Sequence, residues 1–187
     1  MTLILAVIKD GIGYMAGDMC VTQGNSEKLT TTEKVFEKSG VLIGCCGSFR
    51  VINCIYNKLN LKHIVNTAID VDDLAFAFCD ELHRLGVKHG FLKITDSEAE
   101  LAGGSEILLV YKNSIISVGQ DLSYVVLTTP YAAIGVPDHA EGVIFSGYKK
   151  SDPHKLIDKA MKLTASANAG VSTDYILLQE EQSDENT

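Results

Sequence analysis

Two short apolar segments open the chain and predict a β-hairpin. Residues 3–8 are apolar at every position, Asp10-Gly11 favours a tight turn, and residues 12–17 predict the returning strand. A hairpin is antiparallel, yet its first strand is apolar at consecutive positions rather than alternating ones. Both faces of its sheet must therefore be covered, which is unusual for an antiparallel sheet. We expect one face to pack on a second sheet and the other on helices.

The next part of the chain predicts a short buried strand and a helix. Residues 41–44 are apolar and lead into Cys45-Cys46-Gly47, and Ser48 is a favourable N-cap for a helix. The side chains expected on the buried stripe of this helix follow its periodicity: they are Phe49, Ile52, Tyr56 and Leu59.

A second helix and a polar loop are expected to follow. Asp72 is the predicted N-cap, and Gly86 lies near the predicted end of the helix. One face of the helix is apolar and carries Leu74, Phe78, Leu82 and Leu85. Residues 95–104 are polar and predict a loop.

The second half predicts three more strands, two helices and a closing strand. The strands are expected at 107–111, 115–118 and 124–127, and the first pair turns at Lys112-Asn113. Residues 132–135 lead into a helix from about Asp138, and Asp152-Pro153 opens another because proline suits the first helical position. Residues 174–178 predict the last strand. Two helix pairs separated by strands favour a layered α+β fold over a doubly wound parallel sheet.

Length and charge indicate one folded domain with an acidic end. The chain has 187 residues and is 46% apolar, so we expect a single domain over residues 1–179. Its 16 Lys+Arg and 24 Asp+Glu give a net charge of −8. Residues 180–187 carry four acidic residues and no basic one, which predicts an acidic mobile tail. A nucleic acid is not an expected partner of so acidic a chain.

Hydropathy and cysteine usage indicate a cytoplasmic protein. No apolar run reaches the roughly 18 residues that span a bilayer, so no membrane association is expected. The apolar start lacks the basic residues of a signal peptide. The five cysteines are odd in number and form no CxxC pair, which suits reduced thiols. The five histidines lack the spacing of metal ligands, so we expect neither a metal nor a cofactor.

Several sites of known chemistry have weak support. The segment 44–48 lies between a strand and a helix as a P-loop would, but it lacks the lysine and the longer spacing. The sequence contains no GxSxG nucleophile motif. Cys45 and Cys46 could act as nucleophiles, although buried cysteines at the end of a strand are usually inert.

Four residues in the first quarter of the chain remain: Thr2, Asp18, Lys34 and Gly47. Taken singly, each has an ordinary interpretation. Thr2 could be a residue at the edge of a strand, Asp18 and Lys34 could be solvated charges, and Gly47 could be a turn glycine. Only their surroundings point to shared chemistry.

These surroundings resemble the β-type subunits of the proteasome, and in particular the bacterial HslV-type proteases among the N-terminal nucleophile hydrolases. The matching pattern consists of Thr2, the Asp10-Gly11 turn, Ala16-Gly17-Asp18, Thr22-Gln23-Gly24-Asn25, Lys34-Val35-Phe36 and the Gly44–Ser48 turn. The spacing from Thr2 to Asp18 to Lys34 requires no gap. The rest of the chain is similar only in layout. The resemblance implies a four-layer αββα sandwich with two stacked antiparallel sheets flanked by helices, which the apolar first strand supports independently.

The resemblance also implies a mechanism. When threonine is the first residue, its α-amine can act as the base that activates its own hydroxyl. An α-amine has a reference pKa of about 7.7–8.0, and a nearby lysine ammonium would lower it. The resemblance gives this role to Lys34, with Asp18 holding the lysine in place. It gives the stabilisation of the oxyanion to the N–H of Gly47, an effect typically worth about 3–4 kcal/mol.

The second half departs from the pattern of active family members. These usually carry a serine after the Ile-Gly pair, where this chain has Val136, and an Asp-x-x-Ser pair where this chain reads Ala165-Ser166-Ala167-Asn168. The sequence therefore leaves two main hypotheses open. The first is a threonine-type endopeptidase, and the second is a non-catalytic ring or scaffold subunit with the same fold. An amidohydrolase acting on a small amide fits the threonine motif less well.

The peptidase hypothesis carries further expectations. Met1 must be removed, because only then does Thr2 have a free amine. The resemblance implies polypeptide substrates, a homo-oligomeric ring and an ATPase unfoldase that delivers substrates to it.

Overall fold

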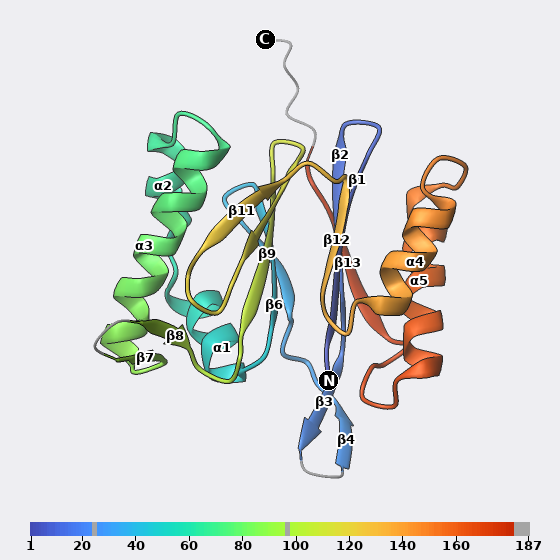
Figure 1. Cartoon of the computed structure of the whole chain (residues 1–187), viewed down its shortest axis with the longest axis horizontal. Helices are drawn as coiled ribbons and strands as arrows, with labels where there is room; N and C mark the ends of the chain where they lie inside the picture. The colour runs from blue at the N-terminus through green and yellow to red at the C-terminus, as the bar shows by residue number, and fades with distance from the viewer. Residues whose placement is uncertain (24–25, 96–97, 182–187) are drawn as a thin grey trace.

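The computed structural model describes residues 1–23, 26–95 and 98–181. Two antiparallel sheets lie face to face in the middle of the molecule, and helices cover their outer faces (Figure 1). The first sheet has the order β12 (Tyr131–Gly135), β1 (Leu3–Lys9), β2 (Ile12–Asp18) and β13 (Tyr175–Gln179). The second has the order β11 (Tyr124–Leu127), β10 (Ser114–Val118), β9 (Glu106–Tyr111), β6 (Val41–Cys46) and β5 (Val35–Lys38). The predicted four-layer αββα sandwich is confirmed.

Five helices in the described part of the chain form the two outer layers. The second sheet is covered by α1 (Phe49–Lys58), α2 (Leu61–Thr67) and α3 (Val71–His89), and the first sheet by α4 (Asp138–Gly147) and α5 (Pro153–Ala167). The described residues also form two small antiparallel strand pairs: β3 (Cys20–Gln23) with β4 (Ser26–Leu29), and β7 (Leu92–Ile94) with β8 (Ala99–Leu101). None of the described helices is long and apolar enough to cross a membrane.

Strand β1 explains why the chain opens with consecutive apolar residues. Leu3, Leu5 and Val7 pack against α4 and α5, whereas Ile4 and Ala6 face the second sheet. All five side chains are fully buried. Burying one Leu or Ile side chain contributes about 1.5–3 kcal/mol, so this strand anchors two layers at once. The inference that both of its faces are covered is confirmed.

The first helical region differs from the prediction in two ways. Its buried stripe is turned by about one residue, since Ile52, Ile55 and Leu59 are buried while Tyr56 is 46% exposed. Tyr56 instead meets the ring of Phe36 edge-on at 5.1 Å between centroids. The helix also ends at Lys58, and a separate helix α2 begins where the Asn60 side chain accepts the N–H of Lys62.

The second predicted helix has different ends. Its N-cap is Asp70 rather than Asp72, and the Asp70 side chain accepts the N–H of Asp73 at 2.9 Å. The helix runs through Gly86 to a left-handed C-cap at Gly90, where φ is +65°. Glycine at that position relieves the clash of a Cβ atom. The predicted loop 95–104 is also partly wrong, because residues 99–101 form β8.

The boundary of the acidic tail needs a correction at Glu180. Its N–H donates to the Gly13 carbonyl at 2.8 Å, and its carboxylate accepts the N–H of Gly13 at 3.0 Å. Glu180 is thus bonded to the folded domain as an extension of β13. Residues 182–187 of the predicted mobile tail lie outside the described residues.

Candidate active site

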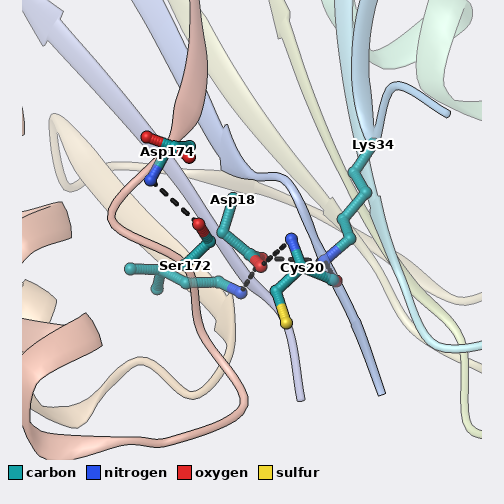
Figure 2. Close-up of polar contacts among 6 residues, drawn as sticks. Asp18, Cys20, Lys34, Ser172 and Asp174 are labelled. Atoms are coloured by element: carbon teal, nitrogen blue, oxygen red, sulfur yellow. Dashed lines mark hydrogen bonds and ion pairs between the residues drawn. The ribbon is translucent and has the colours of Figure 1, made fainter. Parts of the chain in front are cut away.

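The carboxylate of Asp18 holds three chain segments together where β2 ends. It accepts the N–H of Leu3, the N–H of Cys20 and the ammonium of Lys34, each at 2.9 Å (Figure 2). Leu3 is the residue directly after Thr2. Asp18 therefore fixes the start of β1 as well as the lysine.

Lys34 reaches this carboxylate from the residue just before β5. Its ammonium also donates to the carbonyl of Cys20 at 2.6 Å (Figure 2). Lys34 is only 2% exposed and Asp18 only 1%, so the interpretation of both as solvated charges is wrong. Desolvating such a pair costs several kcal/mol per ion, and apolar residues in its place often leave a protein equally stable. A gain in stability therefore does not by itself explain why the protein has this buried ion pair.

Thr2 lies just outside β1, at the edge of a cavity. Its carbonyl accepts the N–H of Val136 at 3.0 Å. Gly135 has φ +88°, and a Cβ atom there would clash with the Thr2 carbonyl. The strand end at Gly135-Val136 thus fixes the backbone of Thr2. The Ile134-Gly135 pair is part of the sequence pattern, but the sequence did not show that the residues around it contact Thr2.

Gly47 connects β6 to the helix α1 and requires glycine for two reasons. Its φ is +94°, and a Cβ atom would lie 2.6 Å from the Cα of Ser105. Its N–H makes no hydrogen bond within the described part of the chain. Ser105, which the sequence analysis missed, supports the turn: its fully buried hydroxyl accepts the N–H of Ser48 at 3.0 Å and donates to Ala102 at 2.7 Å.

A cavity of about 320 Å³ brings Thr2 and Gly47 together. Other residues that line it include Cys20, Cys46, Glu106 and Val136. Asp18 and Lys34 do not line it, but they bind the backbone of Leu3 and Cys20 at its margin. The four predicted site residues therefore come from one small region, with Thr2 and Gly47 facing the cavity and the ion pair buried beside it.

The thiols of Cys45 and Cys46 are poor nucleophiles. Burial, and to a lesser extent the neighbouring Cys46, raises the pKa of Cys45 far above its usual range. Burial is also the main cause that raises the pKa of Cys46 to about 11, while the backbone of Glu106 acts to lower it and the carboxylate of Glu106 acts to raise it. Both thiols are protonated at neutral pH, which agrees with their interpretation as inert residues. All five cysteines are buried and unpaired.

Ser166 and Asn168, which lie where the pattern of active family members has an Asp-x-x-Ser pair, bond to their own helix. The Ser166 hydroxyl donates to Leu163 at 2.7 Å, and the Asn168 amide donates to Thr164 at 3.1 Å. The following loop approaches the chain start at Gly170, where a Cβ atom would lie 3.0 Å from the nitrogen of Met1. Beyond it, Ser172 accepts the N–H of Asp174 at 2.9 Å (Figure 2). Neither Ser166 nor Asn168 lines the cavity.

The described residues contain no group of three or more His, Cys, Asp or Glu side chains that could hold a metal ion.

Comparisons with known proteins support the fold. The sequence matches no protein-family model and no curated protein. Among solved structures, it is similar to BPH from Thiobacillus denitrificans in complex with epoxomicin, with a TM-score of 0.78 and 16% identity over 98% of this chain and 100% of the other. HslV from Trypanosoma brucei gives a TM-score of 0.73 at 16% identity, covering 96% and 99%. Anbu from Yersinia bercovieri gives 0.68 at 13% identity, covering 95% and 81%. The chain has the sandwich fold of HslV and of proteasome-like proteins.

Proposed function

We propose that this protein is a threonine-type endopeptidase whose nucleophile is Thr2 once Met1 has been removed. The observation that carries the proposal is the buried Asp18–Lys34 ion pair. It is bonded to the N–H of Leu3, directly after Thr2, beside a cavity that Thr2 and Gly47 line. An ion pair this well buried is costly for a fold to retain. A role in chemistry at the neighbouring Thr2 gives a reason to retain it.

The proposed reaction uses groups of this chain alone. The neutral α-amine of Thr2 takes the proton of its hydroxyl, and Oγ attacks the carbonyl carbon of the peptide bond. The charge of Lys34 favours the neutral form of a nearby amine by repulsion between like charges. The N–H of Gly47 donates to the oxyanion. The amine then protonates the leaving nitrogen, and water hydrolyses the ester to regenerate Thr2.

We further propose a homo-oligomeric ring that degrades polypeptides delivered by an ATPase unfoldase. The ring is what the resemblance to the HslV-type proteases implies. Anbu from Pseudomonas aeruginosa, a similar solved structure, was solved as a helical assembly, which supports self-association but not closure into a ring. The unpaired cysteines fit a reducing compartment, the cytoplasm. Analytical ultracentrifugation at micromolar concentration should return a large closed species. A monomer would contradict the ring.

One observation favours a second candidate, a non-catalytic subunit with the same fold. Val136 lies in the cavity where the resemblance expects a serine, and Ser166 and Asn168 bond to their own helix. These side chains offer no hydrogen bond that would orient the amine of Thr2. A non-catalytic subunit would have no need of such a bond.

Turnover of the mature protein separates the two candidates. Intact mass first verifies that Met1 is absent. The mature protein should then hydrolyse a fluorogenic peptide and gain the mass of an electrophile such as epoxomicin, the compound in the BPH complex. Thr2→Ala should do neither while it stays folded and assembled, and Thr2→Ser should keep measurable activity because it retains a hydroxyl. A mature protein inert to both reagents would favour the non-catalytic subunit.

A further inference from the structure

We propose that Glu106 makes this site selective for peptides with lysine or arginine next to the bond that is cleaved. The inference rests on the proposed function, because it names the substrate class of the same cavity. Glu106 is an exposed residue at the start of β9, and the pairing of β9 with β6 places it in the cavity.

The register of the second sheet places Glu106 beside the proposed nucleophile. Cys46 and Glu106 are directly paired in the antiparallel ladder of β6 and β9, so their side chains lie on the same face. The Cys46 thiol donates to Oε2 of Glu106 at 3.6 Å. Gly47 follows Cys46 directly, and both residues line the cavity together with Thr2. A substrate side chain beside the attacked carbonyl would therefore meet this carboxylate.

Glu106 is the only charged side chain that lines this cavity among the described residues. The ion pairs found in that part of the chain join Lys34 with Asp18, Arg84 with Glu81 and Lys162 with Asp158, so no basic residue neutralises Glu106. A thiol is a weak hydrogen-bond donor, and it leaves most of the acceptor capacity of a carboxylate unused. Among the described residues, the side chains that line the cavity thus carry one negative charge and no positive one.

A second hollow extends the negative charge away from Thr2. It has a volume of about 540 Å³, shares Glu106 with the first cavity, and is also lined by Glu98, Glu100 and Asp121. Hydrogen bonds from Ser123 lower the pKa of Asp121, which keeps that carboxylate ionised at neutral pH. Clefts lined by charges of one sign attract ligands of the other. A long cationic side chain entering past Glu106 would be attracted by all four carboxylates.

Peptide selectivity should arise from both attraction and rejection. A lysine ammonium or an arginine guanidinium can form a charge-assisted hydrogen bond with Glu106. An apolar side chain in the same place would remove water from the carboxylate without replacing its hydrogen bonds, which costs free energy.

The test compares arginine with citrulline, which has nearly the same shape and no charge. The mature protein should cleave a fluorogenic peptide ending in arginine at least about tenfold faster, by kcat/KM, than the citrulline peptide. Glu106→Gln should reduce the ratio to near one. Asp80→Asn, an equal charge change on the exposed surface of α3, is the matched control and should preserve the ratio. Equal cleavage of both peptides by the unaltered protein would overturn the inference and leave the proposed function standing.

A binding measurement tests the inference when chemistry is absent. Fluorescence anisotropy on Thr2→Ala should show tighter binding of the arginine peptide than of the citrulline peptide, and Glu106→Gln in the same background should remove the difference. Discrimination in binding by an inert mature protein would support the role of Glu106 and contradict the peptidase. Binding without discrimination, or no binding of either peptide, would overturn the role of Glu106 whatever the turnover.

Discussion

Strand β2 has a carboxylate at each end, and the two carboxylates differ in whether a cation accompanies them. At its end, Asp18 binds the N–H groups of Leu3 and Cys20. Near its start, the Glu180 carboxylate accepts the N–H of Gly13. It also lies close to the turn at Lys112 and Asn113, whose backbone N–H groups act to lower its pKa. Both carboxylates tie neighbouring strands together through backbone donors.

Only one of the two has a cation. Asp18 is 1% exposed and is paired with Lys34, whereas Glu180 is half-buried and has no basic partner within the described residues. Burial raises the pKa of Glu180 even though the backbone N–H groups of Asn113, Gly13 and Lys112 act to lower it. Backbone donors are thus sufficient to join strands at one end of the sheet. The lysine at the other end is an addition that strand pairing does not require, and it lies beside the cavity.

The largest expected effect comes from removing the cation. Lys34→Met should lower the free energy of unfolding by about 3–5 kcal/mol, because it leaves the Asp18 charge buried and unpaired. The double variant Asp18→Asn with Lys34→Met should recover much of this loss, since no charge remains. Urea denaturation at neutral pH measures both. Near-native stability of Lys34→Met would contradict the tight burial of the pair.

Peptide turnover separates stability from chemistry in these variants. The double variant should be folded but inactive if the lysine acts on Thr2. Activity in the folded double variant would give the ion pair a purely structural role.

A smaller effect is expected at the other end of β2. Glu180→Ala should lower the free energy of unfolding by about 1 kcal/mol, because backbone N–H groups lose their acceptor. Peptide turnover should stay within about twofold of the unaltered protein, since Glu180 binds the opposite end of the strand from Asp18. A large loss of turnover with little change in stability would contradict the inference that Glu180 only joins strands.

The pH dependence of stability should reveal the raised pKa of Glu180. A carboxyl whose folded-state pKa is raised binds more protons in the folded state than in the unfolded state. Its contribution is therefore fully present below the unfolded-state pKa and is lost as the pH rises through the folded-state pKa. Relative to Glu180→Gln, the unaltered protein should lose stability across this interval. Denaturation curves from pH 4 to 8 measure the difference, and parallel curves would contradict it.

The smallest effect is expected from adding a polar group to the cavity. Val136→Ser should raise kcat by about threefold, because one added hydrogen bond contributes about 0.5–1 kcal/mol and the hydroxyl would face the side where Thr2 lies. Val136→Ala is the matched control, since it removes bulk without adding a hydroxyl. An equal rise in both variants would point to space rather than to a hydrogen bond.

Local patterns predicted most of the fold. The hairpin of β1 and β2, the turn at Lys112-Asn113 and the start of α5 at Asp152-Pro153 each depend on neighbouring residues, so their signals are contained in short segments. The predicted N-cap of α3 was wrong because residues 70–73 contain three aspartates that could take this role. Asp70 is the N-cap because two reciprocal hydrogen bonds favour it: its side chain accepts the N–H of Asp73, and the Asp73 side chain accepts the N–H of Ile69 at 3.3 Å. The first helical stripe was wrong because Phe36, distant in sequence, provides a partner for the exposed Tyr56.

The candidate site likewise has features that the sequence predicts and features that only the fold creates. The sequence by itself singled out Thr2, Asp18, Lys34 and Gly47 as candidates, because their spacing in a single segment resembles a known pattern. Only the tertiary structure decided that Lys34 is buried against Asp18, and that Glu106 and Val136 enter the cavity with Thr2. The physical reason is that burial and cross-strand pairing join residues far apart in the chain. Cys46 meets Glu106 through sheet register, and Val136 meets Thr2 through a strand end more than 130 residues away.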